Sequence, residues 1–126
     1  MTEKMIKKKE PRPYESEVLS VLAFEFPTSH LPESERKIKR RLRDKKLGAY
    51  DQGRIDVLRA FKDDLQQEIS KFSKSKYYTH AHGEYADLQD WDLEQLTRDM
   101  LERHPGVPET VIGGFLPYAI YLYYLR

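Results

Sequence analysis

The residues whose types and spacing could do chemistry begin with a dense cationic run at 36–46. Eight lysines and arginines stand in residues 35–48 against two acids, Glu35 and Asp44. Arginine forks match phosphate oxygens, and nucleic acids bind dense cationic faces through the release of counterions. The sequence therefore predicts a candidate nucleic-acid interface, and its residues are Arg36, Lys37, Lys39, Arg40, Arg41 and Arg43.

Alternatives for this cationic run stay open. If acids from 14–25 or 84–102 pair with it, the run is only a solvated helix face. An anionic membrane surface and an acidic protein are the other partners that it could bind. No aromatic side chains are interleaved with the cations, which disfavours single-stranded nucleic acid. A helix-turn-helix is disfavoured too, because its second helix would carry Asp56, Asp63 and Asp64 against the phosphates.

His80 and His82 form a short motif that could bind a metal ion. Two imidazoles two residues apart can point the same way in an extended loop, and Glu84 and Asp87 could complete a site. The spacing offers no second placed pair of ligands. We therefore expect a hydrogen-bonded or exposed loop with no metal and no cofactor; a metal site or acid–base catalysis is the alternative.

Aromatic side chains gather in the second half of the chain. Tyrosine and tryptophan are enriched at protein interfaces, because they combine apolar area with a polar handle. The sequence predicts contact with a protein partner or with a second copy, as a homodimer, and the alternatives are packing in the core and a ligand pocket. The candidate interface residues are Tyr77, Tyr78, Trp91, Tyr118, Tyr121, Tyr123 and Tyr124.

Signatures of catalysis are missing from the sequence. The chain has no cysteine, which excludes a cysteine nucleophile and a thiolate zinc site. Asp63 and Asp64 are neighbours, and neighbours on a helix face different ways, so they make a poor catalytic dyad. No Gly-rich phosphate loop and no Gly-x-Ser-x-Gly turn is present. We therefore expect a non-enzymatic interaction, adaptor or regulatory protein, with nucleic-acid binding as the alternative function.

Helices must position these residues, because apolar side chains recur at helical spacing. A buried strand over 19–26 is the alternative for the first helix. Gly48 is the expected stop of the second helix, and Asp90 the expected N-cap of the fourth. We expect helices at 14–26, 32–46, 53–73, 90–104 and 108–125.

Two of these helices should form the centre of the fold. An apolar seam runs along 53–73, and its members are Ile55, Leu58, Phe61 or Lys62, Leu65, Ile69 and Phe72. The helix at 108–125 is apolar on all sides, so it should lie in the core or under another chain. Pro117 should kink it.

The whole chain of 126 residues is short enough for one domain. We predict an all-α fold, a small bundle of four to five helices over residues 14–126, with a flexible basic tail at 1–13. The longest uncharged stretch, Thr110–Leu125, is shorter than the roughly 20 residues of a membrane span. No secretory signal follows the N-terminal lysines, so we expect a cytoplasmic protein.

Overall fold

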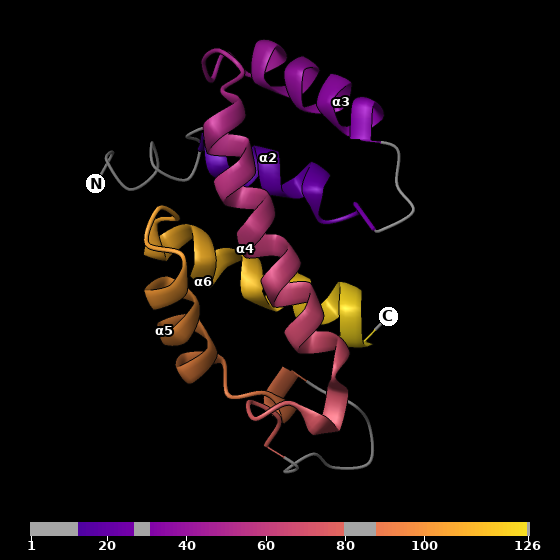
Figure 1. Cartoon of the computed structure of the whole chain (residues 1–126), viewed down its shortest axis with the longest axis vertical. Helices are drawn as coiled ribbons and strands as arrows, with labels where there is room; N and C mark the ends of the chain where they lie inside the picture. The colour runs from indigo at the N-terminus through magenta and orange to yellow at the C-terminus, as the bar shows by residue number, and fades with distance from the viewer. Residues whose placement is uncertain (1–12, 27–30, 80–87, 126) are drawn as a thin grey trace, which may run out of the picture. The chain divides into compact units, whose positions relative to one another are not determined.

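Helices dominate the computed structural model, which describes residues 13–26, 31–79 and 88–125. Within these residues the chain forms five α-helices and no strand, which confirms the predicted all-α fold (Figure 1). The α-helices are α2 (Tyr14–Leu22), α3 (Leu31–Asp44), α4 (Gln52–Ser70), α5 (Leu93–Arg103) and α6 (Glu109–Ile120). Two short 3₁₀ turns, η1 (Phe72–Lys74) and η2 (Leu88–Asp90), and a π-helical segment, η3 (Tyr121–Leu125), complete them.

Contacts divide the chain into two compact units, an N-terminal unit (Met1–Asp51) and a C-terminal unit (Gln52–Arg126). That both belong to one domain over 14–126 stays a prediction. Almost all of the predicted basic tail at 1–13 lies outside the described residues. No helix in the described part of the chain has the length and apolar character that crossing a membrane requires.

The N-terminal unit consists of α2 packed on α3. Residues Val18, Leu19 and Leu22 of α2 are buried, and the helix shows that the alternative of a strand over 19–26 is wrong. The Tyr14 hydroxyl donates to the carbonyl oxygen of Ala49 at 3.1 Å and accepts from the amide of Asp51 at 3.0 Å. This phenol ties the start of α2 to the segment that follows α3.

Helix α3 ends earlier than predicted, and Gly48 is not its stop. Lys46 adopts a left-handed conformation with φ 56°. The amide of Leu47 donates to the carbonyl of Leu42 at 3.0 Å, and that of Lys46 to Arg43 at 3.2 Å. These bonds form a Schellman motif, which normally places glycine at the position that Lys46 occupies.

The C-terminal unit is built on the predicted seam of α4. Ile55, Leu58, Leu65 and Ile69 are buried, and Phe61 and Lys62 both belong to the buried face. Residues of α6 cover this seam, and the rings of Phe61 and Phe115 lie 6.0 Å apart. Helix α5 adds Leu96 and Met100 to the core. Burial of these apolar side chains is the main favourable contribution to folding of the unit.

Two predictions about helix ends are wrong. Helix α4 stops at Ser70, and Phe72 has φ 55°, which leaves its side chain 49% exposed rather than in the seam. Asp92, not Asp90, caps α5, since its carboxylate accepts from the amide of Gln95 at 3.1 Å. Asp90 lies in η2 and is buried.

The last helix has two different faces instead of being covered all round. Six residues are buried: Val111, Ile112, Phe115, Leu116, Ala119 and Ile120. Gly113, Gly114, Pro117 and Tyr118 are exposed. The helix runs through Pro117 and passes into the π-helical segment η3 at Tyr121. Within the chain itself the core therefore covers only one face of α6, and the expected alternative, that another chain covers the rest, stays a prediction.

Candidate functional sites

Helix α3 presents the predicted cationic residues to solvent. Its apolar stripe is narrow, because only Ile38 and Leu42, four residues apart, are buried. All six predicted cations are exposed: Arg36, Lys37, Lys39, Arg40, Arg41 and Arg43. Burial of the stripe thus fixes which way the rest of the helix points.

Cations that flank the buried stripe have partners inside the N-terminal unit. Lys39 lies 3.3 Å from the carboxylate of Glu35 and 5.0 Å from the centre of the Tyr50 ring. The guanidinium of Arg41 lies 3.3 Å from the carboxylate of Glu17, which is 1% exposed. These two side chains help to hold α3 in place.

Cations on the opposite side of α3 have no such partners. Arg36 and Arg40 lie two residues before and after Ile38, which corresponds to a rotation of about 200° away from the stripe. Among the described residues, Arg36, Lys37 and Arg40 form no ion pair or hydrogen bond with another side chain.

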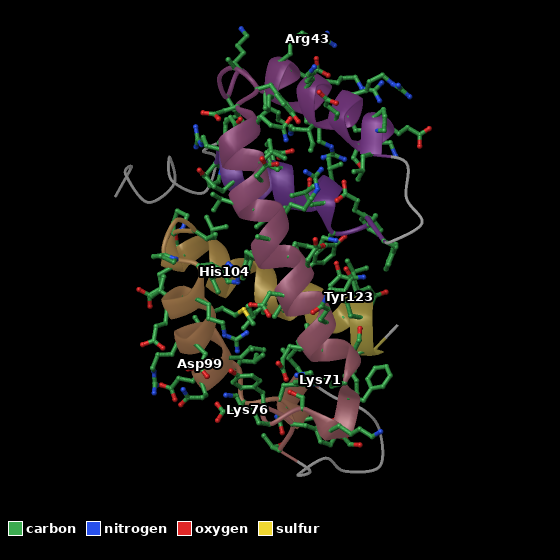
Figure 2. The ribbon with its side chains drawn as sticks, in the orientation of Figure 1. Arg43, Lys71, Lys76, Asp99, His104 and Tyr123 are labelled. Carbon is green, nitrogen blue, oxygen red and sulfur yellow. The ribbon has the colours of Figure 1, made fainter. Side chains whose placement is uncertain are left out.

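Arg43 continues this outer row of arginines by about one turn. It projects outward from α3 in Figure 2. Its guanidinium is 3.5 Å from the carboxylate of its exposed neighbour Asp44, a type of pair that contributes little. We call Arg36, Arg40 and Arg43 the cationic row. Such a row can contact successive phosphates along a strand.

The seven predicted interface residues divide into a buried group and an exposed group. Tyr77 and Trp91 are 2% and 3% exposed, and both lie in the core of the C-terminal unit. Tyr78, Tyr123 and Tyr124 are half-buried. Tyr118 and Tyr121 are the exposed ones, at 40% and 52%. Tyr118 and Tyr121 are therefore the most exposed members of the predicted interface.

Three aromatic rings from distant parts of the sequence form one cluster. The ring of Trp91 lies 5.6 Å from that of Tyr78 and 5.4 Å from that of Tyr124. The Tyr124 hydroxyl donates to the carboxylate of Asp90 at 2.6 Å and lies 3.3 Å from the Tyr78 hydroxyl. Burial, followed by the bond to Asp90, raises the pKa of Tyr124. The cluster holds η3 against the segment before α5, which is a packing role.

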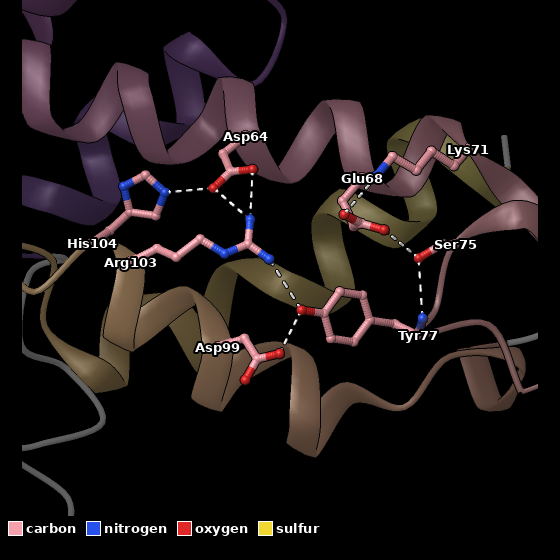
Figure 3. Close-up of polar contacts among 8 residues, drawn as sticks. All are labelled: Asp64, Glu68, Lys71, Ser75, Tyr77, Asp99, Arg103 and His104. Carbon is pink, nitrogen blue, oxygen red and sulfur yellow. Dashed lines mark hydrogen bonds and ion pairs between the residues drawn. The ribbon is translucent and has the colours of Figure 1, made fainter.

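A polar network links α4 to α5 within the same unit (Figure 3). The carboxylate of Asp64 accepts two bonds of 3.0 Å from Arg103 and lies 2.8 Å from Nε2 of His104. Arg103 also donates to the Tyr77 hydroxyl at 3.1 Å, and that hydroxyl donates to Asp99 at 2.6 Å. Each of these side chains forms a hydrogen bond or an ion pair with another member of the network, and the network thereby holds α5 against α4.

A second polar contact closes the end of α4. Glu68 is 6% exposed, and its carboxylate accepts from the Ser75 hydroxyl at 2.6 Å. Lys71 lies 3.2 Å from the same carboxylate, and the amide of Tyr77 donates to the Ser75 oxygen at 3.1 Å. These bonds fix the chain reversal that places Tyr77 in the core (Figure 3).

The histidine motif lies where the structure gives no description. His80, His82, Glu84 and Asp87 all fall outside the described residues, so the predictions made on them stay predictions. In the parts of the chain that are described, no three histidine, aspartate or glutamate side chains gather as a metal site would require.

Comparison with known proteins identifies no relative of this chain. The chain matches no protein-family model, no curated protein and no solved structure. The function must therefore be argued from the two surfaces described above.

Proposed function

We propose that the protein binds nucleic acid through the cationic row of α3. The observation that supports this proposal most is the division of the cations: those beside the buried stripe have partners, whereas Arg36, Lys37 and Arg40 have none among the described residues. A merely solvated helix face whose cations are neutralised by nearby acids would lack this division. Among the acids of 14–25, Glu17 pairs with α3 through Arg41, which lies beside the buried stripe and outside the cationic row.

Spacing and side-chain type fit phosphate binding. Arg36 and Arg40 are one helical turn apart, about 6 Å along the axis. Guanidinium groups donate two bonds to phosphate oxygens in a fixed geometry, and each neutralised phosphate releases counterions. Recognition of this kind reads the backbone and not the base sequence.

The test compares two double variants of equal charge. In Arg36→Gln/Arg40→Gln the cationic row loses two charges, and in Lys74→Gln/Arg98→Gln two exposed cations of the C-terminal unit are lost instead. Affinity for a fluorescent 20-nucleotide DNA is measured by anisotropy at several salt concentrations. We expect only the first variant to bind more weakly, with the slope of log K against log salt reduced by roughly 1.5 to 2. Equal behaviour of the two variants would contradict the proposal.

As a second function we propose contact with a protein partner, in the first place a second copy of this chain. The outer face of α6 and η3 supports it, and from the second turn onward its exposed residues are Gly113, Gly114, Pro117, Tyr118 and Tyr121. This stretch carries no charge, since the exposed Glu109 lies at the start of the helix, and a side chain added at either glycine would meet open space. Uncharged surface containing tyrosine is typical of the centre of protein interfaces.

Light scattering at two salt concentrations tests this second proposal. The N-terminal unit has 13 basic and 9 acidic residues and the C-terminal unit 9 and 12, so the units carry +4 and −3. Association through opposite charges would vanish in 0.5 M salt, whereas association through the uncharged face should persist. We expect a salt-resistant dimer that Tyr121→Asp dissociates and Phe72→Asp, an equally exposed change, does not. A monomer at every salt concentration would refute it.

A further inference from the structure

Cations occupy the centre and both flanks of the outer face of α3. With 3.6 residues per turn, each residue is rotated by about 100° from the one before it. The buried side chains of Ile38 and Leu42 fix the direction of the core. Arg40 then points about 180° away from their midpoint, Arg36 lies about 40° to one side of Arg40, and Lys37 lies about 60° to the other side. The cations therefore straddle the outermost line of the helix.

This outer face is accessible, and two acids set its length. All three of these cations are exposed, and Arg43 continues the side of Arg36 with a side chain that is 74% exposed. Glu33 and Asp44 lie on the same face, near the two ends of α3. They are about 16 Å apart along the axis at 1.5 Å per residue. Contact with phosphates is therefore confined to the middle of the helix.

We propose that the ligand of this face is double-stranded DNA and that α3 lies in its major groove. This inference rests on the proposed nucleic-acid binding and names the class of nucleic acid. An α-helix with its side chains is about 10–12 Å across, and the major groove of B-form DNA is about 12 Å wide. In the groove, Arg36 and Arg43 contact the phosphates of one strand and Lys37 contacts those of the other. Arg40, at the centre, faces the edges of the bases.

Other nucleic acids fit this face less well. A single strand presents one row of phosphates, which the flank of Arg36 and Arg43 can bind without the opposite flank. Proteins that bind single strands also stack the bases on aromatic side chains, and α3 contains no aromatic residue. The major groove of an RNA duplex is deep and narrow, so side chains cannot read it. A face with cations on two flanks therefore favours a DNA duplex.

The helix that would enter the groove is not the one that a helix-turn-helix built from α3 and α4 would use. The second helix of that motif lies in the groove, which would bring Asp56, Asp63 and Asp64 of α4 toward the phosphates. Helix α3 avoids this repulsion, because the central part of its outer face is cationic.

Three nucleic acids of one sequence test the inference on the full-length protein. They are a fluorescent DNA duplex of about 20 base pairs, the RNA duplex of the same sequence and one of the DNA strands alone. The two duplexes carry equal numbers of phosphates, so a difference between them reports on the shape of the groove. Anisotropy at several salt concentrations should show that the DNA duplex binds at least about fivefold more tightly than the RNA duplex.

A single substitution tests the second flank. Lys37→Gln should lower the slope of log K against log salt by about 0.9 on the DNA duplex. The slope on the single strand should stay unchanged, because the arginine flank binds that strand. Lys74→Gln removes an exposed cation of the C-terminal unit instead and should change neither slope.

The outcomes separate the inference from the proposal on which it rests. Suppose that the RNA duplex binds as tightly as the DNA duplex, or more tightly, and that Arg36→Gln/Arg40→Gln weakens both. This result would overturn binding in the major groove and leave nucleic-acid binding intact. Tighter binding of the single strand than of the DNA duplex would overturn the inference in the same way. No binding of any of the three would overturn both.

Discussion

At the scale of single residues, Tyr77 shows how strongly the C-terminal unit depends on one hydroxyl. The phenol is buried, donates to Asp99 and accepts from Arg103. Burial and then the hydrogen bond to Asp99 raise the pKa of Tyr77 to about 12. A phenolate at this position would face the carboxylate of Asp99, so the folded protein holds the neutral form.

This shift in pKa predicts a loss of stability in alkali. Tyrosine in an unfolded chain ionises near pH 10. Because the folded pKa is higher, the contribution of Tyr77 is complete below about pH 10 and is lost as the pH rises through about 12. Urea unfolding from pH 8 to 12 should show a smaller fall in the free energy of unfolding for Tyr77→Phe than for the control Tyr118→Phe. Identical profiles would contradict this account.

Individual residues also show which contacts cannot be predicted from the sequence. In the sequence, Asp64 is notable only because it follows Asp63, and two neighbouring aspartates on a helix make a poor catalytic dyad. In the structure its partners are Arg103 and His104, which are 39 and 40 residues away. No local spacing predicts that contact, because it depends on how α5 packs against α4.

At the scale of elements, the bodies of the helices are predictable and their ends are not. The seam of Ile55, Leu58, Leu65 and Ile69 follows the helical period, and the structure buries it. The ends at Lys46 and Phe72 depend on left-handed backbone conformations, at φ 56° and 55°. Residues other than glycine rarely adopt this region, so the sequence contains no signal for either stop.

Lys46 therefore gives a prediction about the end of α3. Replacing it by glycine removes the clash of its Cβ atom in the left-handed conformation, and we expect the free energy of unfolding to rise by about 0.5 to 1 kcal/mol. Lys45→Gly removes the same charge one residue earlier, where the amide still bonds helically to Arg41 at 3.0 Å. That control should lower stability, as glycine does in a helix. Urea denaturation measures the free energy of unfolding of both variants. If both variants became more stable, or both less stable, the left-handed conformation of Lys46 would not be the cause.

At the scale of the whole molecule, composition and periodicity are enough to predict an all-α chain. The net charge of +1 is uninformative, because it hides units of +4 and −3. The predicted interface is only partly a surface, since Tyr77 and Trp91 have almost no exposure. A count of tyrosines cannot separate core from surface, and only the fold shows that Tyr118 and Tyr121 face outward.

Trp91 is the only tryptophan of the chain, and its surroundings determine what optical experiments can observe. Its indole is buried beside the rings of Tyr78 and Tyr124 in the C-terminal unit. Intrinsic tryptophan emission during heating or denaturation will therefore report on the unfolding of that unit. The N-terminal unit, which carries the cationic row, has no tryptophan and needs a label of its own.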